Sequence, residues 1–100
     1  MRQILDFSDK VFVSVEDELD IIRKYLELEC FKTGNAFTYS IEVAPEVDIY
    51  TMEIPTMIIQ PFLENAIWHG FRNRKGNIIL EVKFEISSEK VLAISITDNV

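Results

Sequence analysis

Residues 55–70 read Pro-Thr-Met-Ile-Ile-Gln-Pro-Phe-Leu-Glu-Asn-Ala-Ile-Trp-His-Gly, and this stretch decides the fold. Its apolar residues recur at intervals of three and four, which predicts an amphipathic helix. Pro55 suits the first turn of that helix, because the amide that proline lacks would be unpaired there. Pro61 would then lie inside the helix and kink it, at a cost of up to about 3 kcal/mol. Gly70, or the residues just after it, ends the helix.

A helical wheel, at about 100° per residue, divides this helix into a buried stripe and other sides. The buried stripe is predicted to consist of Ile59, Phe62, Leu63, Ala66 and Gly70. A flank at the boundary between core and surface is predicted to hold Pro61, Asn65, Trp68 and His69. Glu64 points elsewhere. The helix therefore carries an asparagine on its edge, beside the core.

An earlier helix is predicted over about residues 15–33. Ser14 can accept a hydrogen bond from the first free amides, and three acidic residues in the first turn complement the helix dipole. Leu19, Ile22 and Leu26 recur at helical spacing. Gly34-Asn35 supplies the stop.

Alternating residues predict the strands. Apolar side chains at 37, 39, 41 and 43 indicate a half-buried strand, and a longer one covers residues 78–86. Residues 87–90 form a turn, after which Leu92, Ile94 and Ile96 form the core face of a returning strand. The predicted fold class is α+β: a two-layer sandwich in which helices cover one face of a mainly antiparallel sheet.

Composition and net charge exclude some classes of partner and location. A chain of 100 residues is one domain, and a net charge of −7 argues against nucleic acid or an anionic membrane as partner. The longest strictly apolar run is three residues, far short of the about 20 needed to span a bilayer. No signal peptide is expected. One cysteine, Cys30, cannot form an internal disulfide, so the reducing cytoplasm is the expected compartment.

Two polar residues are candidates for a nucleotide site. The amide oxygen of Asn65 is a hard ligand that suits Mg²⁺, which keeps waters and shares a phosphate with few protein groups. The alternative is that Asn65 bonds a neighbouring loop. Asp98 has the parity of Leu92, Ile94 and Ile96, so it points to the helix side of the sheet. There it could accept a hydrogen bond from the adenine amine, or it could turn out to solvent.

For each of the other candidate residues, a structural role is an alternative to a functional one. His69 follows Asn65 by four residues and shares its face, but a histidine at a helix end also complements the dipole. Trp68 could wall an adenine site, although covering the core is the preferred interpretation. Glu64 could be a general base, yet its wheel position does not suit the ligand that Asn65 would touch. Cys30 is expected in the core.

Taken together, residues 60–70 closely resemble the asparagine box of LytS-type sensor histidine kinases. Residues 13–19 and 25–29 are similar to the stretch that precedes that box in the same family. Residues 76–78 and 96–99 are similar to the strand that leads into the family's first glycine box. The string Gln-Pro-x-x-Glu-Asn-Ala-Ile-x-His-Gly is specific, and the similarity runs almost from end to end.

The resemblance implies a partial Bergerat-type fold that binds ATP and Mg²⁺. By the family pattern, Asn65 would hold Mg²⁺ on the ATP phosphates and Asp98 would read the adenine amine. His69 would line the pocket, and Trp68 and Asn99 are expected beside the nucleotide. Residues 1–13 would end a preceding dimerisation or linker region, and residues 14–100 would form the N-terminal portion of the ATP-binding domain.

The sequence also departs from the family pattern. The family's phospho-accepting histidine lies upstream of the matched region, and Val100 stands where the family has the first glycine of its glycine box. The ATP lid and second glycine box are expected to be missing. Trp68 stands where many relatives carry lysine, and Pro61 occupies the place of the base of gyrase-type relatives. Glu64 is the remaining candidate base.

The resemblance implies part of a two-component sensor histidine kinase, which phosphorylates a histidine and relays the group to a response regulator. The fragment alone is expected to be inactive. The implied partners are the response regulator and the protein's own phospho-acceptor domain, in a homodimer, with the parent anchored in the membrane and this domain in the cytoplasm. The alternative is a non-catalytic signalling module with a degenerate nucleotide pocket, which Val100 favours.

Overall fold

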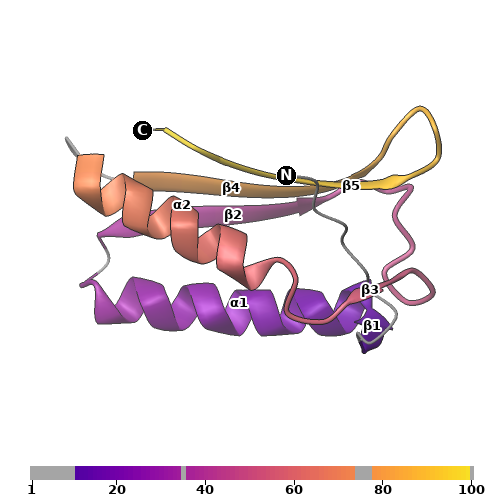
Figure 1. Ribbon diagram of the computed structural model, residues 1–100, viewed down its shortest axis with the longest axis horizontal. Helices are drawn as coiled ribbons and strands as arrows, with labels where there is room; N and C mark the ends of the chain where they lie inside the picture. The colour runs from indigo at the N-terminus through magenta and orange to yellow at the C-terminus, as the bar shows by residue number, and fades with distance from the viewer. Residues whose placement is uncertain (1–10, 35, 74–77, 100) are drawn as a thin grey trace, which may run out of the picture.

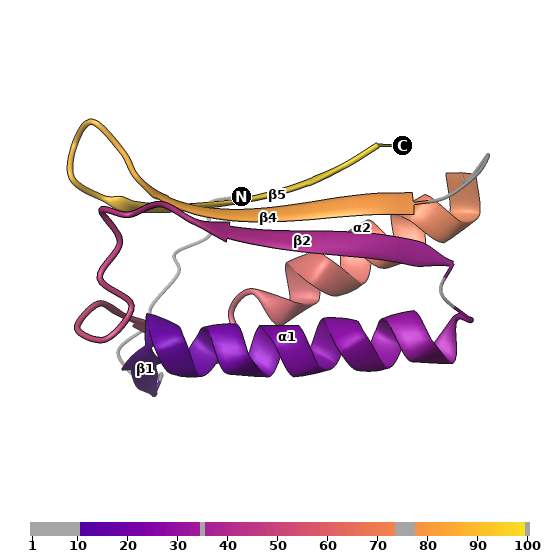
Figure 2. The same ribbon diagram turned by 180° about the vertical axis from the view of Figure 1, so that it is seen from behind.

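The computed structural model describes residues 11–34, 36–73 and 78–99 (Figure 1). The elements in chain order are β1 (Phe12–Ser14), α1 (Val15–Lys32), β2 (Phe37–Val43), β3 (Glu53–Pro55), α2 (Gln60–Asn73), β4 (Ile78–Ile86) and β5 (Leu92–Asp98). Both helices lie on the same side of the sheet formed by β2, β4 and β5, as Figures 1 and 2 show from opposite directions. The predicted two-layer α+β architecture is confirmed. The predictions for residues 1–10, Asn35, Gly76, Asn77 and Val100 concern residues outside the described ranges.

The three-stranded sheet has the order β2-β4-β5. β4 pairs antiparallel with β5, with Leu80 opposite Asp98, whereas β2 pairs parallel with β4, with Phe37 opposite Ile78. A separate antiparallel pair joins β1 to β3. Antiparallel pairing therefore predominates, as predicted. The parallel pair was not predicted, because alternation shows which residues face the core but not the direction of the neighbouring strand.

The core lies between the sheet and the two helices. On β4, every second side chain from Ile78 to Phe84 is at most 1% exposed, while the intervening ones face the other side. From α1, the buried stripe contributes Val15, Leu19, Ile22 and Leu26. The described residues contain no helix with the length and apolar character needed to cross a membrane.

The start of α1 follows the sequence prediction. The Ser14 hydroxyl accepts a hydrogen bond from the Asp17 amide at 3.1 Å. At the other end, the Thr33 amide bonds the Glu29 carbonyl, and Gly34 adopts a φ of +67°. Glycine takes this left-handed conformation without steric cost, which ends the helix where the sequence placed the stop.

The predicted start of α2 was wrong. Pro55 belongs to β3, opposite Phe12, and the helix begins five residues later at Gln60. Between them Met57 has a φ of 63°. This left-handed backbone conformation is incompatible with a right-handed helix, so the helix cannot include Met57. Pro61 consequently lies in the first turn, where its missing amide costs no helical hydrogen bond, and the predicted kink has no cause.

The predicted buried stripe of α2 is confirmed for Ile59, Leu63 and Gly70, but its edge is shifted from Phe62 to Ile67. Ile59, Leu63 and Ile67 are buried, whereas Phe62 is 62% exposed. The stripe follows residues four apart, so Phe62 lies about 100° from Leu63 around the helix. Ile67 therefore replaces Phe62 in the core.

Gly70 allows α2 to approach β4 closely. A Cβ atom at this position would lie 3.0 Å from the Ile78 Cδ1 atom and 3.1 Å from its Cγ2 atom. We expect Gly70→Leu to lower the free energy of unfolding by about 1–3 kcal/mol, because a larger side chain forces the helix away from the strand. Thermal unfolding measures the effect, with the exposed Trp68→Leu as a control on the same helix. Equal melting temperatures for the two variants would contradict this close packing.

Candidate functional site

The polar flank of α2 faces solvent. Asn65 and His69 are exposed, and Trp68 is 63% exposed. The expectation that Trp68 covers the core was therefore wrong, and the flank is not at the core boundary. The reason is the shifted stripe, which is centred near Leu63 and places Asn65 on the opposite side of the helix.

Asp98 lies where strand parity predicted. It is half-buried on the same side of β5 as Leu92, Ile94 and Ile96, while the residues between them are exposed. Its partner across the ladder is Leu80, a core residue of β4. The carboxylate therefore ends β5 on the side of the sheet that the helices cover.

The C-terminal half of α2, which carries His69, lies at the end of the sheet where β5 ends. This helix packs against β4 and β5, whereas α1 packs against β2 and β3. Gly70, next to His69, packs on Ile78, which begins the strand that pairs with the end of β5. The C-terminal half of α2 and the C-terminal end of β5 consequently lie at the same end of the sheet (Figure 1). Asn65 lies one turn before His69 on that helix.

A groove follows the seam between α2 and β5. It has a volume of about 400 Å³ and is lined by Ile58, Ile59, Phe62, Ala66, Ile94 and Ile96. Small-molecule pockets commonly have volumes of about 300–1,000 Å³ and mainly apolar walls. Asp98 follows Ile96 on the helix-facing side of one wall, whereas Asn65 lies on the solvent side of α2. The seam thus combines an apolar surface with one half-buried carboxylate, Asp98, two residues beyond its β5 wall.

The side chain of Asn99 makes a hydrogen bond to the backbone of β4. Its side-chain oxygen accepts a hydrogen bond from the Ile79 amide at 2.8 Å. This bond continues the ladder between β4 and β5 by one step and fixes the chain directly after Asp98. A role of Asn99 at a nucleotide stays a prediction.

Glu64 lies on the other flank of α2, toward α1. Burial raises the pKa of Tyr25 to about 12, and the charges of Glu29 and Glu64 add to this rise. Trp68 follows Glu64 by four residues and therefore shares its side of the helix. Neither Glu64 nor Trp68 lines the groove between α2 and β5, and a role of either residue at a nucleotide stays a prediction.

A cluster of metal ligands is not part of this site. Within residues 11–34, 36–73 and 78–99 there is no group of three or more histidine, cysteine, aspartate or glutamate side chains that could hold a metal. Mg²⁺ often needs only one or two protein ligands because substrate phosphates and waters complete its octahedral shell. The carboxamide of Asn65 fits that mode of binding.

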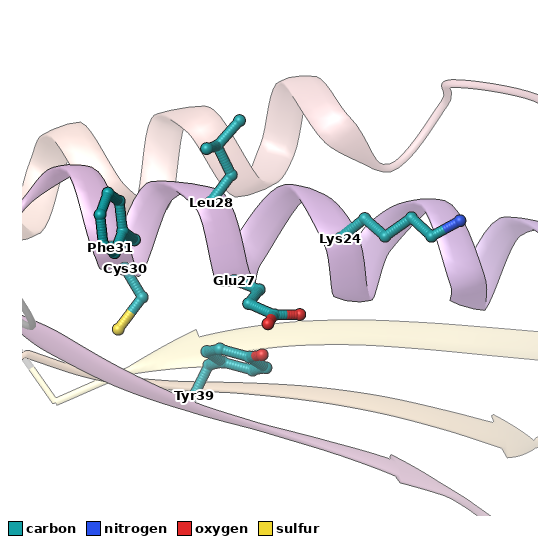
Figure 3. Close-up of a pocket in the computed structure, with 6 residues that line it drawn as sticks. All are labelled: Lys24, Glu27, Leu28, Cys30, Phe31 and Tyr39. Atoms are coloured by element: carbon teal, nitrogen blue, oxygen red, sulfur yellow. The ribbon is translucent and has the colours of Figure 1, made fainter.

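A larger groove, of about 540 Å³, lies between α1 and β2 (Figure 3). Glu27 and Cys30 point from α1 toward Tyr39, while Leu28 and Phe31 point the other way. The Cys30 thiol donates to the Phe37 carbonyl at 3.1 Å, so Cys30 joins α1 to β2. Lys24, the cation of this groove, pairs with Asp20 at 3.0 Å. This groove therefore lacks converging groups for a phosphate.

Glu18 was missed by the sequence interpretation, which assigned it to the helix dipole. It is only 1% exposed, and its Oε2 atom accepts a hydrogen bond from the Met57 amide at 2.8 Å. Burial raises the pKa of Glu18, while the bonds from Met57 and Thr56 oppose that rise. A signal was present, since Glu18 lies three residues after Val15 and four before Ile22, on the buried stripe.

No protein-family model matches the chain. It is 36% identical to the sensor protein LytS of Staphylococcus saprophyticus over 87 residues, which are 87% of the chain and 14% of LytS. It is 31% identical to the sensor histidine kinase/phosphatase LytS of Staphylococcus aureus (strain MRSA252), over 98% of the chain and 16% of that protein. With the sensor histidine kinase YpdA of Escherichia coli (strain K12), identity is 29% over 82% of the chain and 14% of YpdA.

These matches and the fold define the class: the chain is related to sensor histidine kinases. Within that class it is similar to the LytS type, as the residues of the asparagine box predicted. The chain spans only 14% to 16% of the length of these three relatives.

Proposed function

We propose that the chain is the N-terminal portion of the ATP-binding domain of a two-component sensor histidine kinase. Residues 14–100 would form that portion, with a partial Bergerat-type fold, and residues 1–13 would end a preceding dimerisation or linker region. The intact protein would transfer the γ-phosphoryl group of Mg·ATP to a histidine and then to a response regulator. It would act as a homodimer, with this domain in the cytoplasm and the parent anchored in a membrane.

The observation that carries this proposal is the position of Asp98. Its carboxylate lies half-buried on the helix-facing side of β5, at the end of the sheet where α2 carries the asparagine box. An ionised carboxylate only accepts hydrogen bonds, and the adenine amine donates them. The apolar seam beside it offers a surface for a purine ring. Similarity to LytS-type kinases over most of the chain supports the same reading.

Each residue has one task in this proposal. Bound Mg·ATP supplies the phosphoryl group, and the protein contributes mainly positioning and charge neutralisation. Asn65 would hold Mg²⁺ on the phosphates, Asp98 would select adenine, and His69 would line the pocket between them. Trp68 and Asn99 as nucleotide contacts, and Glu64 as catalytic base, remain predictions. The 100-residue chain alone is expected to show little kinase activity.

The test is a calorimetric titration of the intact parent protein with ATP, with Mg²⁺ and with a chelator in its place. We expect Asn65→Ala to weaken Mg·ATP binding at least tenfold, or about 1.4 kcal/mol, because a metal ligand is lost. Without Mg²⁺ the variant and the wild type should bind ATP equally. Asn65→Asp is the matched control, since it keeps an oxygen ligand and should retain the response to Mg²⁺.

A second candidate function is a non-catalytic signalling module. Val100 favours it, because a side chain there would stand where the family pattern has a glycine close to the nucleotide. A wild-type parent protein that binds no ATP at millimolar concentration, with or without Mg²⁺, would support this module and reject the kinase.

A further inference from the structure

Glu18 is a buried carboxylate in which one of the two oxygen atoms, Oε1, has no hydrogen-bond partner. Among the described residues it is the charged side chain that is buried, at 1% exposure. Its Oε2 atom accepts the Met57 amide at 2.8 Å, but its Oε1 atom is buried without a hydrogen-bond partner. Removing a carboxylate from water costs several kcal/mol unless its oxygens are paired. An apolar residue would therefore pack here at lower cost.

Water cannot supply the missing hydrogen bond to the Oε1 atom of Glu18. The crevice around Glu18 also contains Met57, Gln60 and Leu63, and its free space is too narrow for a water molecule. The carboxylate consequently lies between the first turn of α1 and the first turn of α2. Its position suggests a task that an apolar side chain could not perform.

That task concerns the start of α2. This helix has no acidic residue in its first turn, and the residue before it, Ile59, has no side-chain acceptor. The carboxyl group of Glu18 lies beside the first turn of α2, where an acidic group interacts favourably with the positive end of the helix dipole. It also holds the amide of Met57, whose φ of 63° is unfavourable for a side chain of this kind.

We propose that Glu18 is a positioning residue: through the Met57 amide it fixes the turn that starts α2, and thereby the direction in which α2 presents Asn65 to the metal ion of a bound nucleotide. This inference rests on the proposed function, because it assigns Asn65 to the metal. Asn65 lies five residues after the first residue of α2, so a change in the turn at Met57 would tilt or rotate it.

The decisive variant is Glu18→Met, which keeps the length of the side chain but removes the acceptor. Replacing a buried charge by an apolar residue of similar volume is often neutral or stabilising, so the variant should unfold at the same or a higher temperature. The increase in ATP affinity on adding Mg²⁺ should nevertheless fall about tenfold, a change of about 1.4 kcal/mol. Binding of ATP without Mg²⁺ should stay unchanged.

Two controls separate positioning from packing. Glu18→Gln keeps an oxygen that can accept the Met57 amide, so it should retain the Mg²⁺ response within about twofold, or about 0.4 kcal/mol. Glu27→Gln removes an exposed carboxylate from the same helix and should change nothing. A Glu18→Met protein with the full Mg²⁺ response, or with an equal loss of affinity with and without Mg²⁺, would overturn the proposal.

Amide hydrogen exchange provides a readout that does not need nucleotide. In Glu18→Met, exchange should become faster at residues 57–65 and stay unchanged in β4. If the wild type binds no ATP, the proposed function fails, while this local change would still establish Glu18 as the residue that positions α2. Exchange unchanged at 57–65, or faster throughout the chain, would refute the positioning role itself.

Discussion

Replacing Phe84 by alanine is expected to lower the free energy of unfolding by about 3–5 kcal/mol, because the ring is fully buried and its removal leaves a cavity. Phe84 is 0% exposed and lies on β4, the central strand, where it pairs with Val43 on one side and Ile94 on the other. For a domain of this size such a loss lowers the melting temperature by roughly 12 °C or more. Thermal and denaturant unfolding both measure it.

The same strand offers a matched control. Ile79 is 47% exposed on the opposite face of β4, so Ile79→Ala removes apolar surface that is already partly hydrated. We expect that variant to lose less than about 1 kcal/mol. A Phe84→Ala protein that is unfolded at 25 °C agrees with the prediction. Similar, small losses for the two variants would show that the core is not built around β4.

Local sequence patterns were sufficient for most of the elements. The β2 strand and the β4–β5 hairpin follow alternation, and α1 follows helical spacing with a serine cap, as the Ser14 bond to Asp17 confirms. These patterns predict the elements correctly because a helix or strand with one buried face has apolar residues at regular intervals in its sequence. The side of the sheet on which Asp98 lies was predicted for the same reason.

Features that depend on contacts distant in sequence were not predictable in this way. The start of α2 is set by Met57 in a left-handed conformation, and that residue is held by Glu18, 39 residues earlier. The β1–β3 pair likewise joins two three-residue segments, too short to show a period. The wheel also buried Phe62 in place of Ile67 and left Trp68 to cover the core, because it could not show how α2 is rotated against the sheet. Only tertiary structure could correct both.

For the candidate site, strand parity correctly predicted the side of β5 on which Asp98 lies, because a strand's side chains alternate between its two faces. The predicted position of Asn65 at the core boundary was wrong, and the roles of both residues stay predictions. The separation of Glu64 from the α2–β5 seam depends on how α2 lies against α1, where Tyr25 and Leu63 line the same crevice. The packing of one helix against another cannot be predicted from the residue pattern of one helix alone.

The second prediction with a large expected effect concerns recognition of the adenine ring of the nucleotide by Asp98. If Asp98 reads the adenine amine, Asp98→Ala should weaken ATP binding by the parent protein about 10- to 100-fold, or about 1.4–2.8 kcal/mol, because a buried hydrogen bond loses its acceptor. Inosine triphosphate has a carbonyl oxygen in place of the amine. It would oppose the Asp98 carboxylate with a second acceptor, so the wild type should prefer ATP at least tenfold, by about 1.4 kcal/mol.

Exchange of the acceptor for a donor tests this specificity directly. Asp98→Asn can donate from its amide nitrogen to the inosine carbonyl, so its preference for ATP should shrink or reverse, while total binding of inosine triphosphate improves. Thr97→Ala, an exposed position one residue earlier on β5, should leave both affinities unchanged. Equal binding of the two nucleotides by the wild type would mean that Asp98 does not read the base. In that case the position of Asp98 on the helix-facing side of β5 would reflect strand parity alone.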